Sequence, residues 1–242
     1  MTRTDCIRLE SVGRNFGGKT VLEGITLAVN ESEIFGLLGP SGSGKTTLVK
    51  LIAGIDEASA GDVYVLGERM PKLAQLRRIG YMAQSDALYA ELTARENMEF
   101  FAALYGLAGG RRKKRIGETI ELVGLTAHLN RPVRSYSGGM KRRLSLAIAL
   151  LHEPPVLLLD EPTVGIDPVL RQSIWRELES LARSGTTVVV TTHVMDEADR
   201  CHRLGLIRDG RLIAVGTPES MKRETGSATI EQAFLRYGGA AG

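Results

Sequence analysis

A glycine-rich segment near residue 40 has the residue types and the spacing of a phosphate-binding loop. It fits the pattern G-x-x-x-x-G-K-[ST], in which backbone N–H groups surround the phosphates of a nucleotide. Its residues are Gly39, Pro40, Ser41, Gly42, Ser43, Gly44, Lys45 and Thr46. We expect Lys45 to neutralise the β- and γ-phosphates, the Thr46 hydroxyl to bind Mg²⁺, and Thr47 to add a hydrogen bond to a phosphate. The segment alone predicts binding of ATP or GTP.

Two carboxylates follow an apolar run farther along the chain. Asp160 and Glu161 come directly after residues 156–159, which are all apolar. Two acids at the end of a strand are often only solvated, but a phosphate-binding loop in the same chain favours a catalytic interpretation. We therefore expect Asp160 to hold Mg²⁺, through water, and Glu161 to polarise the attacking water as a general base.

Apolar runs that alternate with helical patterns indicate the elements that position these groups. Ile34–Leu38 is predicted to be a buried strand that leads into the glycine loop, and residues 45–53 are predicted to form a helix. Residues 156–159 and 188–190 are predicted to be two further buried strands. This pattern is typical of an α/β fold with a largely parallel sheet, in which ligands gather at the carboxyl ends of the strands.

The stretch between residues 88 and 151 has a different pattern. Strand-like runs give way to helical spacing, as at Ile116, Ile120 and Val123, and we interpret the stretch as a helical subdomain inserted into the α/β core. Its basic run, residues 111–115, is interpreted as a solvated loop leading into a helix, with contact to anionic lipid or a partner as the alternative. The predicted divisions are 1–87 for the first part of an ATP-binding core, 88–151 for the helical subdomain, 152–220 for the second part of the core, and 221–242 for a C-terminal helical tail.

The composition narrows the choice of partners and compartment. The chain has 31 Lys and Arg against 28 Asp and Glu, which lacks the basic excess of a nucleic-acid-binding domain. Cys6 and Cys201 form no C-x-x-C pair, which argues against metal or redox chemistry and fits a reducing compartment. The N-terminus lacks the apolar core of a signal peptide, and no apolar stretch approaches the roughly 20 residues of a membrane-spanning helix. A transport pore would therefore belong to another chain.

The order of the motifs along the chain carries a family resemblance. The phosphate-binding loop is followed by Gln84, by the segment Tyr136-Ser137-Gly138-Gly139-Met140, by the acid pair and by His193. In this order the chain resembles, over nearly its whole length, the nucleotide-binding subunit of an ATP-binding cassette (ABC) transporter. The resemblance implies ATP as the nucleotide. It also implies a P-loop NTPase core, with a mostly parallel sheet flanked by helices and an antiparallel β portion, plus an inserted α-helical subdomain.

The resemblance assigns roles to residues around the bound ATP. Phe16 stands where the family places an aromatic residue, usually tyrosine, that stacks on adenine, and a phenyl ring keeps the face needed for stacking. Gln84 matches the glutamine that contacts Mg²⁺ and the γ-phosphate. His193 matches the switch histidine that contacts the γ-phosphate. With Lys45 and Glu161, Gln84 and His193 form the predicted catalytic set.

Other matching residues are expected to act across a subunit interface. Ser137, Gly138 and Gly139 correspond to the family signature that binds the γ-phosphate of ATP held by the opposite subunit. They are predicted to open a helix, because Leu144, Ile148 and Leu151 then share one face. Asp167 matches the loop that bridges the two subunits. The signature departs from the usual sequence at two positions, with Tyr136 for leucine and Met140 for glutamine, and Met140 lacks the polar side chain on which any role of that glutamine depends.

The function implied is an ATPase that dimerises around two MgATP and drives a separate integral membrane permease. The partner cassette is a second nucleotide-binding subunit, identical or paralogous, and the chain is expected at the cytoplasmic face of the cell membrane, with no nucleic acid partner. Residues 136–140, 164–168 and 228–234 resemble the branch that exports drugs, antibiotics, lipids or ions.

Three other interpretations stay open. An importer subunit is also a separate chain in prokaryotes, and only the exporter-like segments oppose it. A non-transport ABC ATPase acting on nucleic acid or ribosomes is disfavoured by the near-neutral charge and the single cassette. A module that holds ATP without turnover is disfavoured because Glu161 and His193 are both present.

Overall fold

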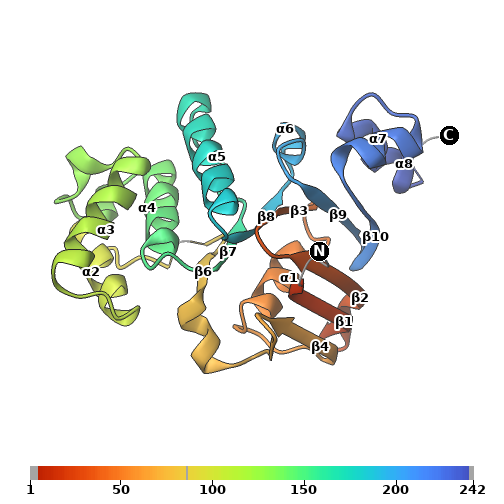
Figure 1. Ribbon diagram of the computed structural model, residues 1–242, viewed down its shortest axis with the longest axis horizontal. Helices are drawn as coiled ribbons and strands as arrows, with labels where there is room; N and C mark the ends of the chain where they lie inside the picture. The colour runs from red at the N-terminus through yellow and green to blue at the C-terminus, as the bar shows by residue number, and fades with distance from the viewer. Residues whose placement is uncertain (1–4, 86, 240–242) are drawn as a thin grey trace.

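The computed structural model describes residues 5–85 and 87–239 (Figure 1). The first four residues, on which part of the signal-peptide argument rests, and residues 240–242, the end of the predicted tail, lie outside the described residues. The described chain contains two sheets, helices packed on them, and three helices that extend to one side (Figure 1).

The central element is a six-stranded sheet in the order β10-β9-β3-β8-β7-β6. Its strands are β3 (Ile34–Leu38), β6 (Ile79–Met82), β7 (Val156–Asp160), β8 (Thr187–Thr192), β9 (Arg203–Arg208) and β10 (Arg211–Gly216). All neighbours pair in parallel except β10, which is antiparallel to β9. Every residue of β3, β7 and β8 is buried, as expected for parallel strands covered on both faces. The three strands predicted from apolar runs are therefore confirmed.

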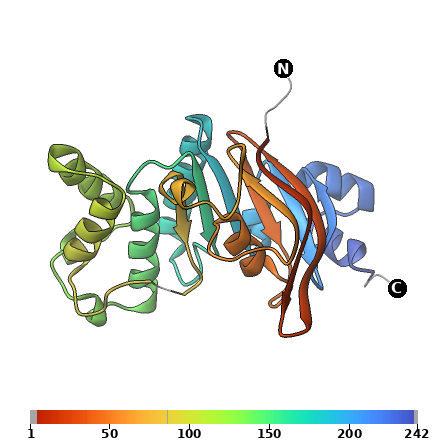
Figure 2. The same cartoon turned by 90° about the horizontal axis from the view of Figure 1, so that it is seen from below.

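A second, antiparallel sheet has the order β2-β1-β4-β5. It consists of β1 (Asp5–Phe16), β2 (Lys19–Asn30), β4 (Ala60–Val65) and the short β5 (Glu68–Arg69). One hydrophobic cluster joins its inner face to helix α1 (Lys45–Ile52) and to one face of the six-stranded sheet. Figure 2 shows α1 between the two sheets. The helix that follows the glycine loop is thus held on both sides.

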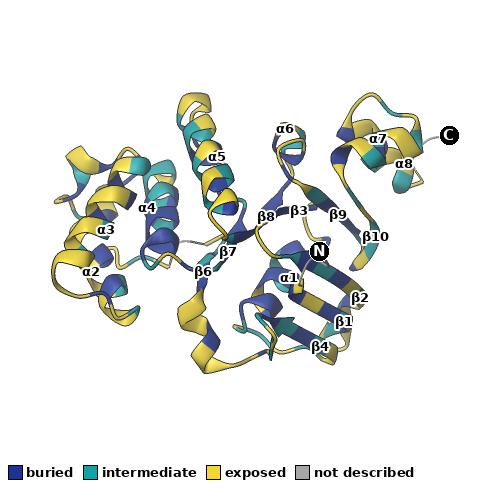
Figure 3. Cartoon of the chain, viewed as in Figure 1, coloured by how far each residue is buried: buried dark blue, intermediate teal, exposed yellow. Residues whose placement is uncertain are grey.

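Three helices, α2 (Ala94–Leu104), α3 (Gly109–Leu122) and α4 (Gly138–Leu150), occupy the stretch predicted to be helical. Thr93 and Glu96 form a reciprocal capping box that starts α2. Ile116 and Ile120 of α3 are buried against the other helices, whereas the outer faces of α2 and α3 are exposed (Figure 3). Short 3₁₀ turns lie at Leu73–Arg78, Thr126–His128 and Val133–Ser135.

The interpretation of residues 111–115 as a loop was wrong, because all five lie within α3. Arg111 forms an ion pair with Glu153, and the Arg115 guanidinium donates hydrogen bonds to the carbonyls of Leu150 and Leu151. These contacts join the basic turns of α3 to the C-terminal end of α4. They favour the helix over a solvated loop.

The remaining helices are α5 (Pro168–Arg183), α6 (Met195–Ala198), α7 (Pro218–Thr225) and α8 (Ile230–Tyr237). α5 packs against β3 and β8, and α7 and α8 pack on each other near the C-terminal end of the described chain (Figure 1). Within residues 5–85 and 87–239, each helix is too short or too polar to cross a lipid bilayer.

Candidate active site

The glycine-rich segment lies between the end of β3 and the start of α1. Gly39 has no room for a side chain, since a Cβ there would lie 2.2 Å from the Ile207 carbonyl oxygen. Gly44 has a φ of 106° in the left-handed region, and a Cβ there would lie 2.6 Å from the Leu22 side chain. Gly44 also precedes α1 as its N-cap and supplies no side-chain cap. The first N–H groups of α1 therefore remain available to an anion.

Lys45 is nine-tenths buried at the first position of α1. Its Nζ donates hydrogen bonds to the carbonyl oxygens of Gly39 and Pro40, at 2.8 and 2.9 Å, so the ammonium lies inside the curve of the loop. Burial lowers the pKa of Lys45, and the nearby carboxylates of Glu161 and Asp160 oppose that shift. The loop thus holds a positive charge close to two negative ones.

Asp160 and Glu161 stand where β7 ends, beside the end of β8. The Thr191 hydroxyl donates to Asp160 Oδ1, while Asp160 Oδ2 is buried with no hydrogen-bond partner. The Glu161 backbone has a φ of 53°, and its N–H donates to the Thr191 carbonyl and hydroxyl at 3.1 and 3.0 Å. Register explains the proximity, because Asp160 and Thr191 are partners in the β7–β8 pairing.

Three predicted catalytic side chains meet at the Glu161 carboxylate. His193 Nδ1 lies 3.1 Å from Glu161 Oε1, and Gln84 Nε2 donates to Glu161 Oε2 at 3.5 Å. Gln84 and His193 follow the ends of β6 and β8. The Glu161 side chain is 15% exposed and that of His193 is 52% exposed, so the histidine is the more solvent-exposed member of the pair.

A cavity of about 310 Å³ lies over the loop and the Glu161 carboxylate. Its lining residues are Val21, Ser41, Gly42, Gly44, Lys45, Thr46, Thr47, Gln84 and Glu161. The cavity brings together most of the residues predicted for the phosphate and metal sites. Asp160 lies buried beneath it, and Ser43 is buried within the loop, where its hydroxyl has no hydrogen-bond partner.

Phe16 lies outside the residues that line this cavity, at the end of β1 where it pairs with Lys19 of β2. It is 46% exposed, and the Arg14 guanidinium lies 4.4 Å from its ring centroid. Arg14 is held there by a two-point ion pair with Asp56. The aromatic ring is thus presented at the surface with a cation against it.

The signature residues and Asp167 also lie away from the cavity. Ser137 is the N-cap of α4 and its hydroxyl accepts a hydrogen bond from the Met140 N–H at 3.3 Å. Asp167 is the N-cap of α5. The two segments touch, since a Cβ on Gly139 would lie 2.9 Å from the Gly165 carbonyl oxygen. One chain therefore presents the phosphate loop and the α4 N-terminus as separate features.

Sequence reasoning missed a buried carboxylate that supports the histidine. Glu197 of α6 is 3% exposed and accepts hydrogen bonds from the hydroxyls of Thr163 and Thr192. Thr192 in turn accepts from the Val194 N–H, which shapes the turn that carries His193. The sequence signal was available for Thr192, which precedes Glu197 by five residues. Thr163 lies in the turn after β7, 34 residues before Glu197, so its contact depends on the fold.

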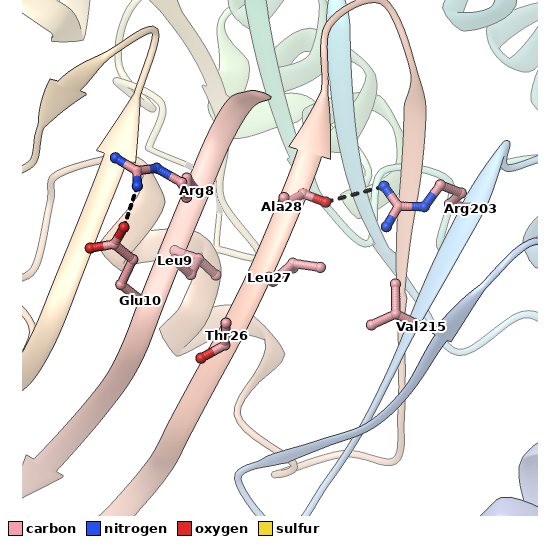
Figure 4. Close-up of a pocket in the computed structure, with 8 residues that line it drawn as sticks. All are labelled: Arg8, Leu9, Glu10, Thr26, Leu27, Ala28, Arg203 and Val215. Atoms are coloured by element: carbon pink, nitrogen blue, oxygen red, sulfur yellow. Dashed lines mark hydrogen bonds and ion pairs between the residues drawn. The ribbon is translucent and has the colours of Figure 1, made fainter. Parts of the chain in front are cut away.

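A second hollow, of about 400 Å³, lies between β1, β2, β9 and β10 (Figure 4). Its two arginines are already engaged, Arg8 with Glu10 and Arg203 with the Ala28 carbonyl and Glu33. Because all of its lining residues within the described chain come from strands, this hollow lacks the features of a phosphate site.

The parallel sheet, the glycine loop at the start of α1 and the acid pair define a P-loop nucleotide-binding protein. A family model described as ABC transporter matches residues 22–164, more than half of the chain. The chain therefore belongs to the ABC transporter family, as an ATP-binding cassette ATPase.

Three similar proteins have names that refer to antibiotic resistance, to export or to multidrug transport. The linearmycin resistance ATP-binding protein LnrL of Bacillus subtilis is 41% identical over 231 residues, which cover 93% of this chain and 74% of that protein. The Nod factor export ATP-binding protein I of Paraburkholderia xenovorans is 41% identical, with 93% and 75% covered. The probable multidrug ABC transporter ATP-binding protein YbhF of Escherichia coli is 40% identical over 95% of this chain, which spans only 41% of YbhF.

Solved structures agree on the fold, and the predicted fold class is confirmed. An ATP-binding subunit of an ABC transporter superposes with a TM-score of 0.90 at 26% identity, covering 96% of this chain and 99% of that one. The dimeric ATP-binding cassette MJ0796, in a post-hydrolysis state bound to ADP and Pi, superposes with a TM-score of 0.81 at 30% identity. It covers 87% of this chain and 98% of the other.

Proposed function

We propose that this chain hydrolyses MgATP as one half of a head-to-tail dimer and drives a separate membrane permease that exports a drug, antibiotic, lipid or ion. The observation that carries the proposal is the separation of the site within one chain. The phosphate cavity contains Lys45 and Glu161, whereas Ser137 is exposed at the start of another helix. A second subunit, identical or paralogous, would bring its α4 N-terminus to the γ-phosphate.

The residues present fit ATP and Mg²⁺. The uncapped start of α1 and the glycine loop offer N–H donors to phosphates, and Lys45 can exchange its two loop carbonyls for phosphate oxygens. The unpartnered Asp160 Oδ2, buried below the cavity, is a hard oxygen suited to Mg²⁺, with the Thr46 hydroxyl and Gln84 on the cavity wall. When bound, Mg²⁺ would neutralise charge on the β- and γ-phosphate oxygens. Phe16 would stack on the adenine through the face that Arg14 leaves open.

The chain's own residues supply the remaining chemistry. The Glu161 carboxylate can accept a hydrogen bond from an attacking water, with His193 and Gln84 holding its two oxygens. His193, which is half exposed, would contact the γ-phosphate. Asp167 would meet the partner subunit beside the bound nucleotide. Loss of the γ-phosphate would remove the contact shared by both subunits, and the dimer would open.

The export assignment follows the relatives, and the permease would place the chain at the cytoplasmic face of the membrane. The division into core (1–87 and 152–220), helical subdomain (88–151) and tail (221–242) fits this scheme, with the subdomain carrying the signature to the partner.

The test is affinity purification of the tagged chain from detergent-solubilised native membranes, with an untagged strain as the control. A polytopic membrane protein recovered in stoichiometric amount supports the proposal and identifies the permease. Recovery of ribosomal or DNA-bound partners alone would contradict it, and a substrate-binding importer complex would reverse the direction of transport.

A further inference from the structure

Arg142 has an unusual set of contacts for a residue of a helix. It lies on α4, five residues after Ser137, and is 8% exposed. Its Nη1 donates to the carbonyl oxygens of Ala83 and Gln84 at 2.9 and 2.7 Å. Its Nε and Nη2 donate to the Glu161 carbonyl oxygen at 3.1 and 2.7 Å.

The same guanidinium also donates to the carbonyl oxygen that precedes Glu161, that of Asp160. One side chain of α4 therefore binds four backbone carbonyls from two segments that are far apart in the sequence. Those segments are the stretch after β6 and the end of β7, and each carries a side chain that lines the cavity. Only arginine has a planar array of five N–H donors that can serve so many acceptors at once.

We propose that Arg142 is a positioning residue for hydrolysis. It holds the backbone at Gln84 and Glu161 so that both side chains reach one point of the cavity. It also ties that point to the helix that begins with Ser137. A shift of α4 then moves the water-polarising carboxylate and the glutamine together. This inference rests on the proposed function, because it assigns Arg142 to the same hydrolytic site.

The geometry of Glu161 explains why such a restraint matters. Its backbone is in the left-handed region, a conformation that a non-glycine residue keeps only when its surroundings hold it. Thr191 binds its N–H, and Arg142 binds its carbonyl. Without Arg142, the Glu161 carbonyl retains the 3.4 Å hydrogen bond from the Val164 N–H but loses the shorter ones from the guanidinium. The peptide plane that follows Glu161 is then held less firmly, and the carboxylate can move away from His193.

The next residue provides a matched control. Arg143 lies on the same helix, and its Nη1 donates to the carbonyl oxygens of Val123 and Gly124 at 3.1 and 3.4 Å. It thus makes the same kind of contact, but to the end of α3 and away from the cavity. If turnover falls merely because α4 packs less well, substitutions at Arg142 and at Arg143 should lower it to the same extent.

The experiment compares Arg142→Gln, Arg142→Lys and Arg143→Gln in the intact chain. Affinity for MgATP, turnover and KM for ATP, and the thermal midpoint are measured for each. We expect Arg142→Gln to bind MgATP within about threefold of the parent, because the phosphate loop is untouched, and to lose at least about tenfold in kcat. Arg142→Lys, which keeps one charged donor, recovers part of the turnover. Arg143→Gln keeps kcat within about twofold.

Equal loss of turnover in Arg142→Gln and Arg143→Gln would overturn the inference, as would a kcat for Arg142→Gln near the parent value. If Arg142→Gln does not fold, the turnover and MgATP affinity of Arg142→Lys provide the test instead. Failure of both to fold would reduce Arg142 to a structural residue. Normal turnover in Glu161→Gln would instead remove the proposed function, whatever the Arg142 variants show.

Discussion

At the scale of single residues, the site depends on how Glu161 is held. Its carboxylate oxygens meet His193 and Gln84, and its backbone is bound on both sides by Thr191 and Arg142. Electrostatic preorganisation of this kind supplies most of the catalysis in phosphoryl transfer. The roles of Glu161 and His193 were expected from the order of the motifs. Their mutual contact could not be, because nothing in a linear sequence shows that two strand ends are adjacent.

His193→Ala should lower ATP turnover by about 10²-fold, since it removes the group that lies 3.1 Å from the Glu161 carboxylate. The imidazole is half exposed, so the thermal midpoint should change little. Steady-state ATPase assays measure the loss, with His128→Ala, which lies outside the cavity-lining residues, as the control. Equal activities for the two variants would exclude His193 from the reaction.

His152 is expected to make the fold sensitive to acid. Its ring stacks on Tyr105 with centroids 3.7 Å apart, and burial lowers its pKa from 6.5 to about 4. Between these pH values the unfolded chain binds a proton at His152 that the folded chain does not bind. The free energy of unfolding is therefore unaffected by this group above pH 6.5 and decreases as the pH falls toward 4.

His152→Phe keeps the stacked ring and removes this proton. Chemical denaturation measures the free energy of unfolding at pH 7 and at pH 5. The decrease between these pH values should be larger for the parent than for the variant, by up to about 2 kcal/mol. Identical losses in the two proteins would show that other groups cause the acid sensitivity.

At the scale of elements, the apolar runs predicted β3, β7 and β8, and the polar residues that follow them predicted the site. The pairing of β1 with β2 and β4 could not be predicted from the pattern, since its register depends on contacts between distant residues such as Ile7 and Val65. The expectation of a loop at residues 111–115 was wrong for a similar reason, because the acceptors of Arg115 come from the end of α4.

The packing of α4 on β6 gives a prediction at this scale. A Cβ on Gly80 would lie 2.3 Å from the Ala149 carbonyl oxygen, so Gly80→Ala must push α4 away and should cost about 1–3 kcal/mol. Gly117 lies within α3 with open space around it, and Gly117→Ala should stabilise by about 0.5–1 kcal/mol. Urea denaturation of both variants tests the contrast. A neutral effect of Gly80→Ala would show that α4 and β6 are less tightly packed than described.

At the scale of the whole molecule, the phosphate cavity and the N-terminus of α4 are separate features of the chain. The cavity lies over the phosphate loop, and the α4 N-terminus with Ser137 lies elsewhere on the described surface. The family resemblance predicted this division, whereas residue patterns alone predicted only a nucleotide site. Neither the cavity nor the α4 N-terminus indicates which substrate is transported, because both are assigned to ATP.

The most direct test of this account is the behaviour of Glu161→Gln with MgATP. The substitution removes the base but keeps the size of the side chain and leaves the phosphate loop intact. Size-exclusion chromatography with light scattering, beside an ATPase assay, should show an ATP-dependent dimer and turnover reduced by about 10²-fold or more. The surface variant Glu153→Gln, which weakens ion pairs with Arg111 and Arg115 outside the site, should behave like the parent. A Glu161→Gln chain that stays monomeric with MgATP, or hydrolyses it at the parent rate, would contradict the account.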